Sequence, residues 1–244
     1  MRRDIRILLA TACLGAAIAW GGGIPAAVVA MEMFRVEDVE VRGLRYLEEN
    51  EVEGLLALAP ETSIWSDKAP WHERVAAHPL VKDVRVSRRL PDRLLVVVTE
   101  RTPIALAPTP TLEAMDAEGR RLPLDPAEFR LDLPVIHTAR RPPRGSRHFP
   151  QDVRRLAAEV EHLMASDTAF LQLVSSVAWS GPGAVAVRWT DPEVEFLLPI
   201  HASPARLREG LGALEDAATR TRDGMPDVID LRFADQVVVR RTQN

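Results

Sequence analysis

Residues 80–101, LVKDVRVSRRLPDRLLVVVTER, contain two strand-like runs joined by a short turn. Pro91 and Asp92 suit the central positions of a turn, so the two runs should pair as a hairpin. The first run alternates valine with polar residues, which predicts a half-exposed strand. The second run is continuously apolar from Leu94 to Val98, which predicts a largely buried strand.

A strand and two helices are predicted directly before this hairpin. Residues 34–43, FRVEDVEVRG, alternate as a short strand and end at a glycine. Residues 47–60 place apolar side chains at helical spacing, with glutamates near the helix start and a proline at the end. Residues 69–79 repeat the pattern, and Pro79 disfavours helix at the residue before it. The predicted order over residues 34–101 is therefore strand, helix, helix, strand, strand.

The rest of the chain, residues 102–244, is predicted to be a β-rich domain with two helices. The first helix has an apolar stripe from Val153 to Met164, and the second begins at the N-cap Ser203 with Pro204 in its first position. The predicted strands are short and separated by Pro, Gly and Asp: residues 104–107, 112–115, 135–137, 174–179, 184–189, 195–200, 228–233 and 236–240. The fold class is therefore α+β, in two domains.

The N-terminal segment predicts where the protein resides. Residues 7–31 form a run of 25 residues without a charge, long enough to span a bilayer as one helix. Arginines at positions 2, 3 and 6 precede it, so residues 1–6 should be a cytoplasmic tail and the domains should lie outside the cytoplasm. The alternative is a cleaved signal peptide, because Ala17-Ile18-Ala19 resembles a cleavage site. Both interpretations make the globular part extracytoplasmic.

Composition excludes some classes of function. The net charge of −4 does not indicate a nucleic-acid-binding surface, so no nucleic-acid partner is expected. The single cysteine, Cys13, lies within the apolar segment. The domains are therefore free of thiols, which suits an oxidising compartment.

Catalytic motifs are not evident in the sequence. The six histidines have no paired metal-ligand spacing, and the chain contains no G-x-S-x-G motif. Glu159 and His162 share one face of a predicted helix, and we interpret them as solvated rather than as half of a metal site. A protein of this kind is expected to work through contacts, with no cofactor, no metal and no enzymatic activity.

Two stretches of the first domain resemble a known family. The opening FRVEDVEVRGLRYLEENEV and the closing HPLVKDVRVSRRLPDRLLVVVTERTPIA are similar to a POTRA domain of the FtsQ/DivIB type. The likeness continues at MDAEGRRLP and at VIDLRFADQVVVR near the C-terminus. The resemblance implies one membrane helix, residues 7–31, a POTRA domain, residues 34–101, and an FtsQ-type β domain, residues 102–244.

The same resemblance implies a non-enzymatic scaffold of the bacterial divisome. Such a protein crosses the inner membrane once, with its N-terminus cytoplasmic and its domains periplasmic, at the division septum. It binds FtsB and FtsL and helps to recruit and regulate septal peptidoglycan synthesis.

The resemblance also implies where partners bind. In this family the terminal strand of the β domain has a free edge, to which a segment of FtsB adds by β-augmentation. Phe233 is expected to be an apolar anchor, and the arginines should suit an acidic partner. The matching positions are Arg232, Phe233, Asp235, Val237, Val238, Val239, Arg240 and Arg241. On the POTRA domain, other divisome membrane proteins are expected to dock on the surface of Arg85, Arg88, Arg89 and Arg93.

Two alternatives remain open from the sequence. POTRA domains also occur in proteins of outer-membrane assembly and secretion, but those continue into a membrane β-barrel, which the sequence does not predict here. The second alternative is an exported cell-wall enzyme or binding module built on the β domain. Converging carboxylates in residues 102–244 would favour an enzyme, whereas an open terminal strand would favour an adaptor.

Overall fold

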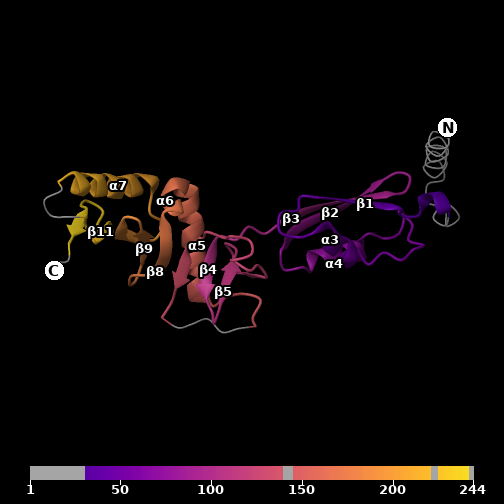
Figure 1. Cartoon of the computed structure of the whole chain (residues 1–244), viewed down its shortest axis with the longest axis horizontal. Helices are drawn as coiled ribbons and strands as arrows, with labels where there is room; N and C mark the ends of the chain where they lie inside the picture. Colours follow the sequence, from indigo (N-terminus) through magenta and orange to yellow (C-terminus); the bar gives the residue numbers. More distant parts are fainter. Residues whose placement is uncertain (1–30, 140–144, 221–224, 242–244) are drawn as a thin grey trace. The chain divides into compact units, whose positions relative to one another are not determined.

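The computed structural model describes residues 31–139, 145–220 and 225–241, which divide into two compact units (Figure 1). One unit ends at Arg101, and the other begins at Thr102. The predicted membrane helix and cytoplasmic tail lie outside the described residues, except for Met31. Within the described ranges, no helix has the length and apolar character needed to cross a membrane.

In the described residues of the first unit, the α-helices α3 and α4 accompany a three-stranded sheet with the strand order β1-β3-β2. Strand β1 runs parallel to β3, and β2 runs antiparallel to it. This arrangement confirms the predicted order of strand, helix, helix, strand, strand. The elements are η1 (Glu32–Phe34), β1 (Asp38–Arg42), α3 (Glu49–Leu56), α4 (Ala69–Ala76), β2 (Val81–Arg89) and β3 (Arg93–Glu100).

The β2–β3 hairpin has the burial that its sequence predicts. In β2 the side chains of Val84 and Val86 are buried, whereas those between them and on either side are largely exposed. Strand β3 is buried along most of its apolar run, but Val97 is 37% exposed. Val97 is paired with the exposed Arg85. Both side chains lie on one face of the sheet, and the buried Val84 and Val86 lie on the other face.

The second unit is built on a nine-stranded sheet with the order β12-β11-β10-β9-β8-β7-β4-β5-β6. The mixed α+β class is therefore confirmed. The elements are β4 (Ala105–Pro108), β5 (Leu112–Met115), β6 (Arg121–Leu122), β7 (Val135–His137), α5 (Gln151–Ser166), α6 (Thr168–Gln172), β8 (Val174–Trp179), β9 (Ala184–Thr190), β10 (Glu193–Pro199), α7 (Pro204–Thr219), β11 (Val228–Asp230) and β12 (Val238–Arg240).

Two short elements of this unit were not predicted from the sequence. Helix α6 has five residues and begins where the Asp167 side chain accepts a hydrogen bond from the Phe170 N–H at 2.9 Å. Strand β6 has only two residues. Neither is long enough to show a hydrophobic period. The described residues of this unit therefore contain three helices where the sequence predicted two.

Helices α5 and α7 pack on the sheet, and their buried side chains form part of the hydrophobic core. Helix α5 packs against β7 and β8, and α7 packs against β11 (Figure 1). In the same core Phe170 of α6, Trp189 of β9 and Phe196 of β10 form an aromatic cluster with ring centroids 4.9 to 5.3 Å apart. The predicted cap of α7 is present, because Ser203 Oγ accepts a hydrogen bond from the Arg206 N–H at 3.2 Å.

The chain ends the sheet with a hairpin of β11 and β12. Strand β11 runs parallel to β10, and β12 runs antiparallel to β11. Both strands are shorter than the predicted ranges of residues 228–233 and 236–240. The residues between them, 231–237, are named the hairpin loop below.

Candidate partner-binding site

Strand β12 forms one end of the nine-stranded sheet and pairs with β11 alone among the strands that the structure describes. The Arg240 carbonyl accepts a hydrogen bond from the Asp227 N–H at 3.1 Å, so the backbone groups of Arg240 face β11. Because successive residues of a strand alternate in direction, the N–H and C=O of Val239 face away from the sheet. The edge at Val239 can therefore accept another strand.

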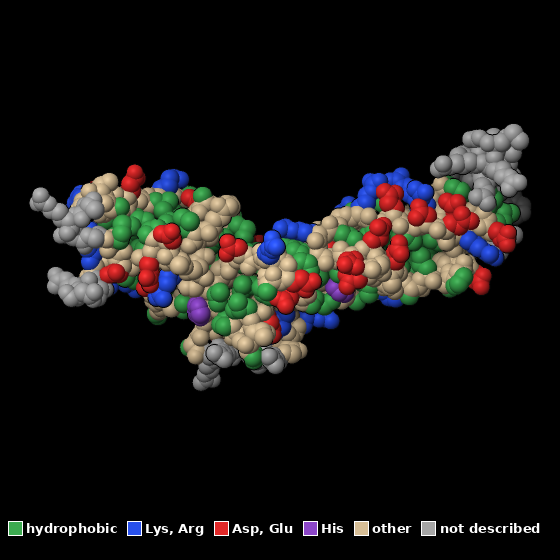
Figure 2. Space-filling model, viewed as in Figure 1, with side chains coloured by type: hydrophobic (Ala, Val, Ile, Leu, Met, Phe, Trp, Pro, Cys, Tyr) green, Lys and Arg blue, Asp and Glu red, His purple; other side chains and the backbone are tan. Residues whose placement is uncertain are grey.

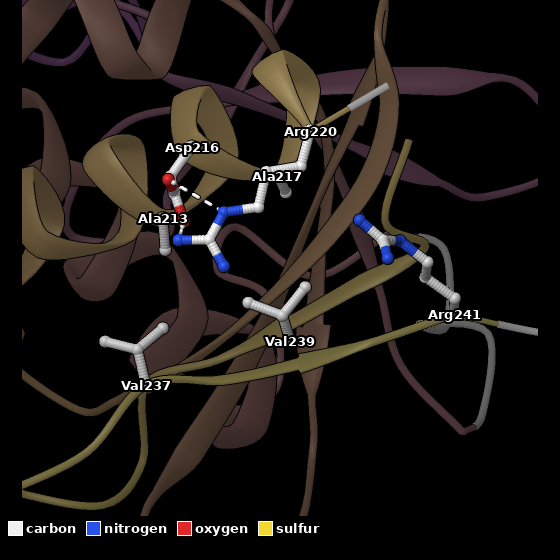
Figure 3. A pocket seen from close by; sticks show the side chains of 7 residues that line it. All are labelled: Ala213, Asp216, Ala217, Arg220, Val237, Val239 and Arg241. Atoms are coloured by element: carbon white, nitrogen blue, oxygen red, sulfur yellow. Dashed lines mark hydrogen bonds and ion pairs between the residues drawn. The ribbon is translucent and has the colours of Figure 1, made fainter. Parts of the chain in front are cut away.

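A groove lies between this edge strand and helix α7, with a volume of about 580 Å³ (Figure 3). Small apolar side chains from both elements form its walls. Its charged side chains include Arg220, which is paired with Asp216 at 2.8 Å. The lining residues are Ala213, Asp216, Ala217, Arg220, Val237, Val239 and Arg241. An apolar side chain with a neighbouring charge fits such a groove.

The opposite face of the hairpin carries a buried carboxylate. Asp230 is fully buried and is bound by the guanidinium of Arg232 at 2.9 and 2.7 Å and by that of Arg240 at 3.0 Å. The hydrogen bonds from the Arg232 side chain hold the pKa of Asp230 below its ordinary value, and the same bonds raise the pKa of Arg232. These three residues, the Asp230 cluster, tie β12 to β11.

The hairpin loop is held from the side of helix α7. Arg206 donates hydrogen bonds to the carbonyls of Leu231, Phe233 and Gln236. Phe233 itself projects from the loop with 43% of its surface exposed. The loop therefore presents an apolar ring next to the open edge.

The structure gathers the predicted residues of the terminal strand into one region but in different environments. Val237 and Val239 line the groove, and Asp235 is exposed in the hairpin loop. Val238 is half-buried and lies opposite Asp230. The side chains of Arg232 and Arg240 both form ion pairs with Asp230 of the same chain.

Sequence reasoning missed Asp230, and it assigned Arg232 to the partner rather than to Asp230. The two residues stand two positions apart in an apolar stretch, a spacing that puts both on one face of an extended chain. The residues on α7 gave no such signal, because their proximity to β12 depends on how the helix packs.

The four arginines of the POTRA surface are also distributed unevenly. Arg88 donates to the carbonyls of Ile64 and Ser66, and Arg93 pairs with Asp38 at 2.7 Å. Arg85, Arg89 and Arg93 are all exposed, and Arg85 lies 3.7 Å from Asp83. Basic and acidic side chains are interspersed over the visible face of this unit (Figure 2).

The expectation of a solvated Glu159 is wrong. Its carboxylate is buried and accepts a hydrogen bond from the backbone N–H of His201 at 2.9 Å, and it lies 3.2 Å from His201 Nδ1. His162 is bound as well, with its Nε2 3.0 Å from the Ala202 carbonyl. The turn after β10 folds onto α5 and covers both residues. Within the described residues, no group of three or more His, Cys, Asp or Glu side chains is arranged to hold a metal ion.

Comparison with known proteins identifies relatives for both units. The family model of the POTRA domain, FtsQ-type, matches residues 34–101. A cell division protein FtsQ from Rhodothermus marinus is 27% identical over 218 residues, which cover 86% of this chain and 79% of that protein. An FtsQ from Geotalea daltonii is 24% identical over 248 residues, covering 99% of this chain and 88% of that protein.

Further matches are shorter. An FtsQ from Novosphingobium aromaticivorans is 37% identical over 112 residues, which cover 43% of this chain and 35% of that protein. The solved extracytoplasmic domain of the bacterial cell division protein DivIB from Geobacillus stearothermophilus aligns over 42% of this chain and 82% of that domain, with 19% identity and a TM-score of 0.31.

Proposed function

Because the chain belongs to the FtsQ/DivIB family of bacterial cell division proteins, we propose that it acts without catalysis, as an adaptor that binds FtsB and FtsL outside the cytoplasm. In this role it helps to recruit and regulate septal peptidoglycan synthesis. A single N-terminal helix anchors it in the inner membrane at the septum.

The observation that supports this proposal most is the open edge of β12. A segment of FtsB adds to this edge as a further strand, and its backbone bonds to the outward N–H and C=O of Val239. One set of its alternating side chains faces the α7–β12 groove. The other set lies on the side of Arg240, whose side chain is 54% exposed beside Asp230 and suits an acidic residue.

A second contact surface belongs to the POTRA domain. We propose that other divisome membrane proteins dock on the side of the sheet that carries Arg85, Arg89 and Arg93, because all three are exposed. Arg88 has a different role in this proposal. It stabilises the domain by binding two backbone carbonyls within it, so its loss should lower stability rather than affinity alone.

Two proline variants test the strand-addition site. Proline lacks a backbone N–H, so Val239→Pro removes a donor that faces the partner, whereas Val238→Pro removes a donor that faces β11. We expect Val239→Pro to lower the affinity for FtsB of the same organism at least about tenfold, with the melting temperature nearly unchanged. Val238→Pro should lower the melting temperature.

Affinity is measured by titrating FtsB onto the intact, detergent-solubilised protein, and melting is followed by circular dichroism. Phe233→Ala should also weaken binding without unfolding, since the ring is exposed. If Val239→Pro binds FtsB normally, the terminal strand is not the site. If wild-type protein does not bind FtsB, the proposed partnership is wrong.

A further inference from the structure

A single arginine of helix α7 binds three backbone carbonyls of the hairpin loop. The guanidinium of Arg206 donates to the Leu231 carbonyl at 3.0 Å, to the Gln236 carbonyl at 2.7 Å and to the Phe233 carbonyl. Its remaining terminal nitrogen pairs with Glu209 on the same helix. Only 11% of the side chain is exposed, although α7 lies at the surface.

The contacts use the planar, forked shape of arginine. Three backbone carbonyls from two ends of one loop converge on a single rigid group, and Glu209 fixes its orientation. A lysine ammonium is a point charge on a flexible stem and lacks this fork. Retaining the positive charge alone therefore does not reproduce the contacts.

The loop that Arg206 holds controls two features of the candidate site. It contains Phe233, and it sets the position at which the chain enters β12. Ordering a loop during binding lowers affinity, because the entropy of ordering is lost at that step. A loop already ordered by Arg206 avoids this cost.

We propose that Arg206 is a positioning residue for the partner site, which it prepares by fixing the hairpin loop before the partner arrives. This inference rests on the proposed function, since it concerns the same strand. Arg206 acts through Phe233 and β12, and the partner strand need not touch it.

The first test needs no partner. In intact protein, Arg206→Ala should accelerate amide hydrogen exchange of residues 233–237 about tenfold, because the loop loses its side-chain anchor. Arg206→Lys should behave like Arg206→Ala. Arg208→Ala, at an exposed position two residues along the same helix, is the matched control and should leave the exchange rates unchanged.

The second test is a double-mutant cycle for FtsB affinity. Arg206→Ala should weaken binding at least about tenfold in the wild-type background but much less in the Phe233→Ala background, because Arg206 acts partly through that ring. Mere weakening of the fold would give equal losses in both backgrounds. Melting temperatures of all variants show that they are folded.

Unchanged loop exchange in Arg206→Ala, additive losses in the cycle, or full rescue by Arg206→Lys would each overturn the positioning role. If the loop responds as expected but wild-type protein does not bind FtsB, the proposed function fails. Arg206 then stabilises the hairpin loop but has no part in partner recognition.

Discussion

At the scale of single residues, Asp230 explains why two of the predicted contact arginines have a structural role. A fully buried carboxylate needs compensating charge, and Arg232 and Arg240 provide it across the hairpin. The pairing leaves the cluster with more positive than negative charge. An acidic partner would therefore meet arginines that are already oriented by Asp230.

Asp230→Asn should destabilise the protein by about 1–3 kcal/mol at pH 7, because the charged hydrogen bonds to Arg232 are lost. The pKa of Asp230 is lowered in the folded state, so its contribution is complete above the ordinary value of about 3.9. That contribution is lost as pH falls through the lower, folded-state pKa. The difference in stability between wild type and variant should consequently shrink below about pH 4.

Denaturant unfolding at pH 7 and at several acidic values measures this difference. Asp235→Asn is the matched control, since Asp235 is exposed in the adjoining loop. A stability difference that stays constant down to the lowest pH would show that the ionised form of Asp230 does not stabilise the protein.

At the scale of elements, helix α7 packs closely on the start of the hairpin loop at one glycine. A Cβ added at Gly210 would lie 2.5 Å from Leu231 Cδ1, whereas one added at Gly212 would meet nothing within 4 Å. We therefore expect Gly210→Ala to destabilise the protein by about 1–3 kcal/mol, through overpacking. Gly212→Ala should stabilise it by about 0.5–1 kcal/mol, since alanine favours helix.

The two glycine variants are each other's control, because they change the same helix in the same way. Chemical denaturation of both gives the comparison directly. Equal effects of the two substitutions would contradict the close packing of α7 on Leu231.

Strands separated by Pro, Gly and Asp could be predicted from the sequence, including the ends of several. Residues 112–115, 135–137 and 174–179 were predicted as strands and form β5, β7 and β8. Short elements such as α6 and β6 could not be predicted, because they are stabilised by local caps and by neighbours. Strand β11 ends before its predicted limit at Phe233, where Arg206 binds the loop.

The candidate site was predictable only in part, for a physical reason. The edge of β12 was expected from the resemblance, and the alternation of valines predicts its two faces. The supporting contacts join residues 25 to 30 positions apart, from Arg206 to Leu231 and Gln236. Such contacts depend on tertiary packing, which no local pattern in the sequence encodes.

At the scale of the whole molecule, the family match and the candidate site belong to different units. The FtsQ-type family model matches the first unit, residues 34–101, whereas the open strand and its groove belong to the second. A sheet edge supplies backbone groups to any extended segment, so selectivity comes from side chains beside it. In the proposed site those side chains belong to Phe233, the lining of the groove and the Asp230 cluster.

The orientation in the membrane is the last property to test. Because arginines precede the uncharged run of residues 7–31, we expect the N-terminus to stay in the cytoplasm and the rest to be exported. A reporter enzyme that is active only outside the cytoplasm should therefore work when fused after Asn244. Replacing the arginines at positions 2, 3 and 6 by glutamate should lower its activity several-fold, because the cytoplasmic anchor charges are gone.

Membrane retention distinguishes an anchor from a cleaved signal peptide. A retained helix keeps the mature protein in the membrane pellet after a high-salt wash, since burial of about 20 apolar residues does not depend on ionic strength. Mass spectrometry of the mature protein gives its first residue. A soluble species beginning near Trp20 would contradict the anchor, and FtsB binding would then have to occur without tethering of this chain to the bilayer.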